Sequence, residues 1–200
     1  MKMEITSSVF TFIVALAAVI NGLGIVKIVV GMGEYIRRRE SLNISYYWVY
    51  SLVIVFQLLA HVLLWWALIG LREIGSMNLL QYLYVLLGPT LLFLATSMLV
   101  PDFKDNNVDL RAEYRRLRKP YFSILAIFWV WSMFIWPIFG YPMAPTWKMA
   151  VCWMTIAIIL RVTENAKINA ALVVTNLILL MIYIGIYAME LGGISLQMTQ

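Results

Sequence analysis

Long apolar runs constrain this chain more than any other feature of its sequence. Each is long enough to cross a bilayer as a helix of about 20 residues, and the five clearest cover residues 9–30, 44–70, 79–100, 121–140 and 169–190. Backbone N–H and C=O groups cannot stay unpaired in hydrocarbon, so such runs are helical when they span. The sequence therefore predicts an all-α, polytopic transmembrane helical bundle.

A sixth span at residues 147–164 is weaker than the others. Its uninterrupted apolar residues cover only 149–160, which is about half to two-thirds of the length that a vertical helix needs. Lys148 and Arg161 flank this stretch, and their long side chains can snorkel to opposite interfaces. The alternative is a re-entrant or interfacial segment. We predict about six spans in total.

The composition leaves no material for a soluble domain. Hydrophobic residues make up 63% of the 200 residues and charged residues only 12%, far from the composition of soluble proteins. Six spans of about 20 residues with short loops use nearly the whole chain. We therefore expect residues 1–200 to form a single transmembrane domain.

The basic residues predict the orientation of the spans. An alternating six-span topology with both termini outside leaves only Lys2, Arg72 and Lys148 of the 15 basic residues on the outer side. By the positive-inside rule, this distribution favours that topology. The basic residues assigned to the cytoplasmic side are Lys27, Arg37, Arg38, Arg39, Lys104, Arg111, Arg115, Arg116, Arg118, Lys119, Arg161 and Lys167. Their location in loops between apolar runs also argues against nucleic acid as a partner.

The basic loop over residues 102–119 predicts a cytoplasmic amphipathic helix between spans 3 and 4. Leu110, Tyr114 and Leu117 share one face of a helix over 108–119, and Asn106 or Asn107 is the expected N-cap. We expect the apolar face to lie on the headgroups of the bilayer. The residues expected to contact anionic lipid headgroups are Arg111, Arg115, Arg116, Arg118 and Lys119.

Two neighbouring segments resemble a known family. The strings LGPTLLFLATSMLVPD and DLRAEYRRLRKPYF are similar to segments of bacterial six-helix integral membrane proteins of about 200 residues, a family whose function is uncharacterised. The likeness covers the middle half of the chain. It implies a bacterial inner membrane, and it transfers no functional residue.

Enzyme chemistry has little support in the sequence. His61 and Cys152 are the only histidine and the only cysteine, which leaves few groups for acid–base or metal chemistry. No hydrolase, metalloprotease or phosphate-loop motif is present. A haem would need a second chain or a methionine to complete its ligands. We therefore predict no catalytic residue, no metal and no cofactor.

Uncharged polar side chains predict a polar layer near the middle of the bundle. The residues that we place in it are Asn21, Gln57, His61, Thr90 and Asn176, with Ser132 and Thr175 at a similar level. His61 follows Gln57 by one helical turn, and we expect its ring to be neutral there because desolvation disfavours the charged form. Gly24 extends the Asn21 face with a small residue. The layer is either polar glue between helices or the lining of a solute pathway.

The eight tryptophans fall into two groups. Five lie near predicted span ends, where indoles favour the interface, namely Trp48, Trp65, Trp66, Trp136 and Trp147. Trp129, Trp131 and Trp153 lie deeper. These three pack between helices, the more usual role, or line a pocket for an apolar or cationic ligand.

Two classes of function follow from these patterns. The first is a small channel or transporter for an ion or a small polar solute, which we expect to be a homo-oligomer. The second is a non-conducting membrane module that binds lipid or a partner membrane protein. Acidic residues occur only at the ends of two spans, as Glu164 and Glu190, and none lies in an apolar interior, which weakens proton-coupled and sodium-coupled mechanisms.

Overall fold

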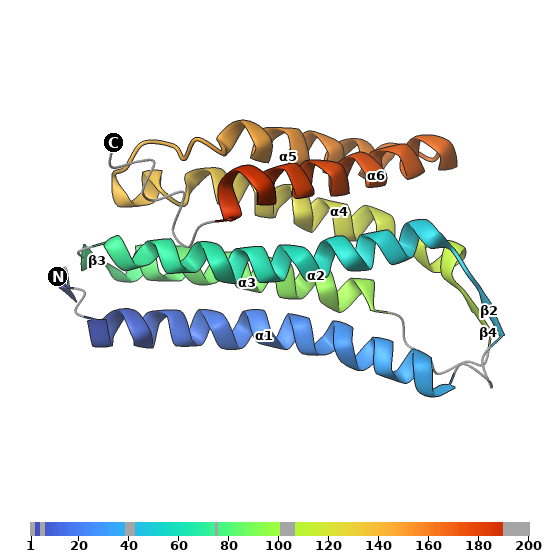
Figure 1. Cartoon of the computed structure of the whole chain (residues 1–200), viewed down its shortest axis with the longest axis horizontal. Coiled ribbons are helices and arrows are strands. Elements are labelled where there is room, and N and C mark those ends of the chain that lie inside the picture. Colours follow the sequence, from blue (N-terminus) through green and yellow to red (C-terminus); the bar gives the residue numbers. More distant parts are fainter. Residues whose placement is uncertain (1–2, 5–6, 39–42, 75, 101–106, 190–200) are drawn as a thin grey trace.

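The computed structural model describes residues 3–4, 7–38, 43–74, 76–100 and 107–189, and this part of the chain is built from helices lying side by side (Figure 1). The prediction of an all-α bundle is confirmed. The six α-helices are α1 (Ser7–Arg38), α2 (Trp48–Leu68), α3 (Leu79–Leu99), α4 (Leu110–Phe134), α5 (Trp147–Val162) and α6 (Ala166–Tyr183).

Short elements connect or extend these helices. β1 (Met3–Glu4) pairs antiparallel with β3 (Ser76–Met77), and β2 (Asn43–Ser45) pairs parallel with β4 (Asn107–Asp109). Two 3₁₀ turns follow α2 and α4, and a π-helical turn extends α6. They are η1 (Ile69–Glu73), η2 (Pro137–Phe139) and η3 (Ile184–Ala188).

The helices pack in a fixed order across the bundle. α1 lies along α3 and also contacts α2, α4 lies between α3 and α5, and α6 contacts α2 and α5 (Figure 1). The main core is built from α2, α3, α4, α5 and α6. On the outer face of α1 the apolar side chains are exposed, with Val19 at 58% and Val30 at 62%. A bundle with apolar groups on its outside is what a lipid environment requires.

Five of the six predicted spans are helices that are long and apolar enough to cross a membrane. The exception is α5, which has 16 residues and therefore extends over about 24 Å, less than the hydrocarbon core of about 30 Å. It occupies the segment in which the sequence already shows the shortest apolar run. Lys148 and Arg161 lie at its two ends.

The separate amphipathic helix predicted between spans 3 and 4 is wrong. Residues 110–119 are instead the first turns of α4, which continues through Pro120 to Phe134. Asp109, and not Asn106 or Asn107, caps this helix, because its carboxylate accepts hydrogen bonds from the backbone N–H groups of Arg111 and Ala112 at 2.8 and 3.1 Å. Both asparagines precede the cap, Asn106 outside the described residues and Asn107 in β4.

The predicted contact of Leu110, Tyr114 and Leu117 with headgroups is also wrong. All three side chains are buried in the main core of the protein. The Tyr114 ring contacts the rings of Tyr47 and Tyr50, at centroid distances of 5.5 and 6.5 Å. Protein side chains cover this apolar face, and lipid cannot reach it.

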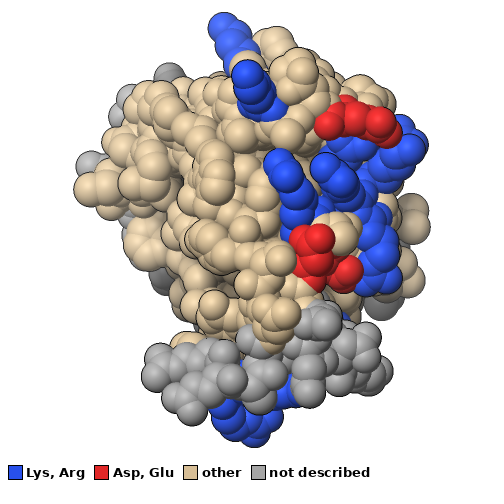
Figure 2. Space-filling model, turned by 90° about the vertical axis from the view of Figure 1, so that its right-hand side faces the viewer, with Lys and Arg blue, Asp and Glu red and all other residues tan. Residues whose placement is uncertain are grey.

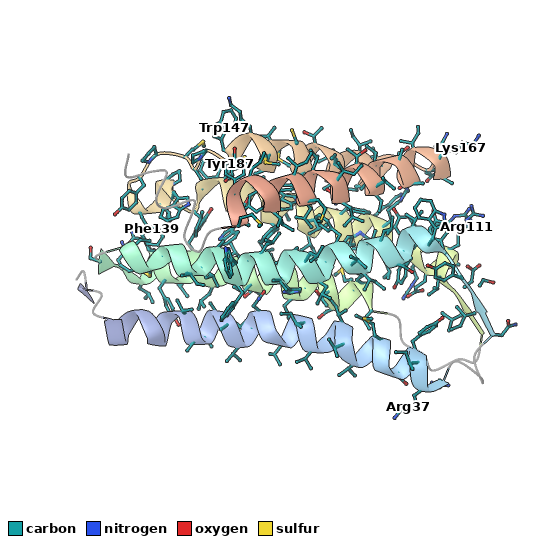
Figure 3. All side chains as sticks on the ribbon, viewed as in Figure 1. Arg37, Arg111, Phe139, Trp147, Lys167 and Tyr187 are labelled. Carbon is teal, nitrogen blue, oxygen red and sulfur yellow. The ribbon has the colours of Figure 1, made fainter. Side chains whose placement is uncertain are left out.

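The two ends of the bundle differ in chemistry. Arg37, Arg111 and Lys167 lie at one end, and Trp147 and Tyr187 lie toward the other (Figure 3). We refer to them as the arginine-rich end and the aromatic end. Seen from the arginine-rich end, Lys and Arg side chains gather mainly on one side of the surface, with two smaller patches of acidic residues among them (Figure 2).

Candidate functional site

A buried polar layer joins four helices near the middle of the bundle. Its side chains are Asn21 of α1, Gln57 and His61 of α2, Thr96 of α3 and Tyr121 of α4, and none of them is more than 1% exposed. Buried polar groups are costly unless they are hydrogen-bonded. The pairing within this layer therefore decides its role.

His61 is at the centre of the polar layer. Its Nδ1 lies 2.7 Å from Oδ1 of Asn21, and its Nε2 lies 2.7 Å from the Thr96 hydroxyl. The Asn21 amide nitrogen donates to the His61 backbone carbonyl at 2.9 Å, which fixes the amide oxygen toward the ring. An amide oxygen can only accept, so Nδ1 carries the ring proton and Nε2 accepts from Thr96.

Gln57 completes the polar layer on the side of α4. Its amide nitrogen donates to the Leu92 carbonyl at 3.1 Å and to the Thr96 hydroxyl at 3.0 Å. Its amide oxygen accepts from the Tyr121 hydroxyl at 2.8 Å. Donors and acceptors thus alternate in one direction, from Tyr121 through Gln57, Thr96 and His61 to Asn21. The layer is a satisfied network, because these bonds use the polar groups of all five side chains.

A glycine allows the His61 ring to reach α1. A Cβ at Gly24 would lie 2.3 Å from Cε1 and 2.5 Å from Nε2 of His61, distances that no side chain tolerates. Any larger residue at position 24 would displace the ring. The small-residue face expected around Asn21 is therefore the face that receives His61.

Thr90 and Asn176 do not join the polar layer. Thr90 donates to the Leu86 carbonyl of its own helix at 2.8 Å. Asn176 is buried on α6, and none of the hydrogen bonds described for the five side chains of the layer involves it. Ser132, expected at this level, donates to the Trp129 carbonyl of its own helix at 2.8 Å.

Sequence reasoning missed Thr96 and Tyr121. Tyr121 had a detectable signal, because Leu110, Tyr114, Leu117 and Tyr121 share one helical face and are all buried in α4. Thr96 had none, because its position depends on how α3 is rotated about its axis. Both residues belong to the candidate polar layer.

The residues predicted to contact anionic lipid are divided between surface and interior. Arg111, Arg115, Arg116 and Lys119 are exposed on α4, whereas Arg118 is only 7% exposed. Arg118 lies beneath the α5–α6 connection, where its guanidinium is 3.9 Å from the Glu164 carboxylate. The exposed four lie on helix turns at the arginine-rich end.

An aromatic pocket lies between α2, α4, α5 and α6, toward the aromatic end. It encloses about 140 Å³, and none of the described residues that line it is charged. It shares Ala60 and Leu64 of α2 with the core, but no residue of the polar layer lines it. Six of the eight tryptophans do so, namely Trp66, Trp129, Trp131, Trp136, Trp147 and Trp153.

Two parallel indoles form one wall of the aromatic pocket. The rings of Trp129 and Trp153 stack with centroids 4.5 Å apart and an interplanar angle of 19°. Tyr183 meets Trp153 edge-on, with centroids 5.4 Å apart. The deep tryptophans thus do both things that the sequence allowed, because they pack between helices and also line a pocket.

Trp131 is held differently from Trp153. Its Nε1 donates to the Tyr84 carbonyl at 2.7 Å, and the Tyr84 hydroxyl donates to the Trp131 carbonyl at 2.9 Å. Gly88 makes room for this indole, since a Cβ there would lie 2.2 Å from Cη2 of Trp131. The Trp153 indole N–H, in contrast, is buried without a hydrogen-bond partner among the described residues.

The chain matches no family model, no curated protein and no solved structure. Function must therefore be argued from the geometry alone. Among the described residues, no three His, Cys, Asp or Glu side chains come close enough together to hold a metal ion. The five side chains of the polar layer are hydrogen-bonded to one another, and the aromatic pocket is the region with space for a ligand.

Proposed function

We propose that the protein is a non-conducting membrane module that binds a lipid in the aromatic pocket. The observation that carries this proposal is a pocket of about 140 Å³ lined by aromatic and aliphatic side chains. Cavities of about 150 Å³ with apolar walls stay dry and admit a benzene ring. A ring or a short piece of an acyl chain fits this space, whereas an ion or a sugar would lose its hydration without compensation.

Transport through the polar layer has less support. A pathway needs side chains whose polar groups can exchange between protein and solute. Here the hydrogen bonds of Asn21, Gln57, His61, Thr96 and Tyr121 go to one another and to backbone carbonyls. The channel or transporter stays a prediction, and so does the homo-oligomer.

The proposed orientation places the arginine-rich end in the cytoplasm and the aromatic end outside, in a bacterial inner membrane. Support comes from the residues that gather at each end (Figure 3). α1 begins and η3 ends at the aromatic end, because the short α5 still returns the chain to the arginine-rich end before α6 (Figure 1). The exposed arginines of α4 then meet anionic headgroups, each contributing about 1 kcal/mol.

Accessibility of introduced cysteines tests the orientation. Met143 precedes the start of α5, and Lys167 lies in the first turn of α6 at the other end of the bundle; both side chains are exposed. Met143→Cys and Lys167→Cys are made separately in a Cys152→Ser background. An impermeant thiol reagent on intact cells should label position 143, and position 167 only after lysis. Labelling in the reverse order would contradict the proposed orientation, but it would not bear on lipid binding in the aromatic pocket.

Retention of lipid tests the proposed function. Ala150 is 6% exposed and lines the aromatic pocket, so Ala150→Leu fills part of its volume. Wild-type protein washed extensively in detergent should retain bound lipid, measured by native mass spectrometry, and Ala150→Leu should lose most of it. The matched control is Ala171→Leu on the exposed face of α6, which should retain lipid as the wild type does.

Two outcomes would contradict the proposed function. One is wild-type protein that keeps no lipid under conditions in which it stays folded and monodisperse. The other is equal retention by Ala150→Leu and Ala171→Leu. If Ala150→Leu does not fold, Ala67→Leu at the exposed rim of the pocket provides the same comparison with less overpacking.

A further inference from the structure

Arg116 and Arg118 of α4 are paired in different ways. Arg116 is exposed, and its Nε donates to the Glu113 carboxylate at 3.1 Å. Arg118 is only 7% exposed, and its side chain donates no hydrogen bond within the described part of the chain. Its one ion pair among the described residues is with Glu164 at 3.9 Å, which is too long for a hydrogen bond.

A buried guanidinium without hydrogen bonds is unusual in a folded protein. It carries five N–H donors and always keeps its charge, and a buried charge is costly unless it is paired and hydrogen-bonded. Nε of Arg118 is fully enclosed by protein, whereas neither terminal nitrogen is. An acceptor from outside can therefore reach Arg118 through Nη1 and Nη2.

The α5–α6 connection covers Arg118 without bonding to it. The Asn169 amide nitrogen donates to the backbone carbonyls of Thr163 and Asn165, each at 3.0 Å. The Tyr114 hydroxyl donates to the Asn169 amide oxygen at 3.1 Å, which ties the connection to α4 one turn before Arg118. The connection is thus fixed in place by hydrogen bonds that do not involve the Arg118 guanidinium.

Glu164 shows the direction from which an anion can approach Arg118. Its side chain is 83% exposed, and its Oε1 is the carboxylate oxygen that lies 3.9 Å from Nη2. An ion pair with one partner in solvent holds weakly. The carboxylate can therefore move away at little cost, and another anion can take its place from the same side.

We propose that Arg118 binds the phosphate of an anionic phospholipid headgroup, which takes the place of the Glu164 carboxylate. The planar guanidinium presents N–H donors in a fork that matches phosphate oxygens. Arg115 and Lys119 are exposed close to Arg118 in the sequence, and their charges attract anions to this surface. The site lies at the end of the bundle opposite to the aromatic pocket, so the proposal does not rest on the lipid proposed there.

The position of the site favours a lipid headgroup over a phosphate in solution. α4 belongs to a segment that is long and apolar enough to cross a membrane. The α5–α6 connection lies at the arginine-rich end, where Lys and Arg side chains gather (Figure 2). In a bilayer, headgroup phosphates are concentrated at this level, and basic residues near the surface are attracted to anionic lipids.

Competition between two lipids tests the proposal. The purified full-length protein in detergent is offered phosphatidylglycerol and diacylglycerol with the same acyl chains, and their occupancies are compared by native mass spectrometry. The wild type should prefer phosphatidylglycerol by tenfold or more, about the value of one hydrogen bond to a charged group. Inorganic phosphate at millimolar concentration should not displace the lipid. Displacement would overturn the lipid headgroup as the occupant.

Two arginine substitutions make the test specific for the buried guanidinium. Arg118→Gln should lower the preference for phosphatidylglycerol about tenfold. Arg116→Gln removes the same charge from an exposed side chain that is already paired with Glu113, and should lower the preference by less than about twofold. Because preference is a ratio within one sample, it can be measured even if a variant is less stable.

Glu164→Gln provides an independent test at an exposed residue, where the fold should tolerate the change. Removing the competing carboxylate should raise the preference for phosphatidylglycerol about threefold. The matched control is Glu34→Gln, which removes a carboxylate paired with Arg38 on α1 and should leave the preference nearly unchanged.

Two results would overturn the proposal. Equal effects of Arg118→Gln and Arg116→Gln would show that the basic surface attracts lipid without a specific site. A preference that stays the same or falls in Glu164→Gln would show that Glu164 does not compete with lipid and serves only as the structural partner of Arg118.

Discussion

The two faces of α2 contact two very different regions. On one face Gln57 and His61 are fully buried in a hydrogen-bonded network. On another, Leu63 and Ala67 border a pocket whose lining is mainly aromatic and aliphatic. In a membrane bundle, polar side chains near the midplane therefore indicate where helices are fastened together. In this protein, the space for a ligand lies between helices that meet through large aromatic side chains.

The largest expected effect is at the closest approach of α1 to α2. Gly24→Ala would put a methyl group 2.3 Å from Cε1 of His61, and displacing the ring should destabilise the protein by about 2 kcal/mol or more. Unfolding in mixed detergents measures this. Gly22→Ala is the control, because a Cβ there meets nothing within 4 Å, and alanine favours the helix by about 1 kcal/mol. Equal stability of the two variants would show that α1 is not held by the polar layer.

A smaller effect is expected from removing one member of the polar layer. Gln57→Leu deletes the acceptor of the Tyr121 hydroxyl and the donor to Thr96, and should cost about 1–2 kcal/mol. Thr90→Val is the control, since among the described residues Thr90 bonds within its own helix, to the Leu86 carbonyl, and it should change stability by less than about 0.5 kcal/mol.

Gln57→Leu also distinguishes a polar layer that only holds helices together from one that lines a solute pathway. If the polar layer only fastens helices, proteoliposomes containing the wild type should be no more permeable than protein-free vesicles, and Gln57→Leu should change nothing. The assay follows ions and small polar solutes under voltage and pH gradients. Flux in the wild type that Gln57→Leu abolishes without unfolding the protein would support a pathway. The polar layer would then have a functional role and not only a structural one.

The smallest effect is expected for an isolated polar contact. Tyr114 donates to Oδ1 of Asn169 at 3.1 Å, so Tyr114→Phe should cost about 0.6 kcal/mol, the average for such bonds between membrane helices. Tyr46→Phe, at a residue that is 67% exposed, should be neutral. The free energy of unfolding of both variants, measured as above, shows whether the polar layer stabilises the protein by more than a single hydrogen bond does. A Tyr114→Phe effect as large as that of Gln57→Leu would show that it is not.

The sequence predicts the helices well and their ends less well. Apolar runs indicated the five helices that are long and apolar enough to cross a membrane, and the short run at 149–160 indicated the short α5. The first turns of α4 were misplaced because arginines interrupt the apolar run, although a helix can carry exposed arginines on one face and core residues on the other. Asp109 caps that helix, and α4 continues through Pro120 to Phe134.

The candidate site is only partly visible in the sequence. Gln57 and His61 are related by local spacing, and Asn21 by its depth in the first span, so all three could be placed in one layer. Thr96 could not, because the rotation of α3 depends on packing with its neighbours. The unpaired N–H of Trp153 was equally hidden, since Trp131 and Trp153 look alike in the sequence and differ only in what surrounds them.

Photo-crosslinking tests the central claim most directly. A lipid with a diazirine on its acyl chain is incorporated into bilayers with the wild-type protein and activated, and the adducts are mapped by mass spectrometry. Binding in the aromatic pocket predicts adducts on buried lining residues such as Leu64, Ala150 and Trp153, which are 3–6% exposed. The polar layer should carry none. Adducts confined to outward-facing residues such as Val62 and Ile158, which are 49% and 46% exposed, would contradict the account.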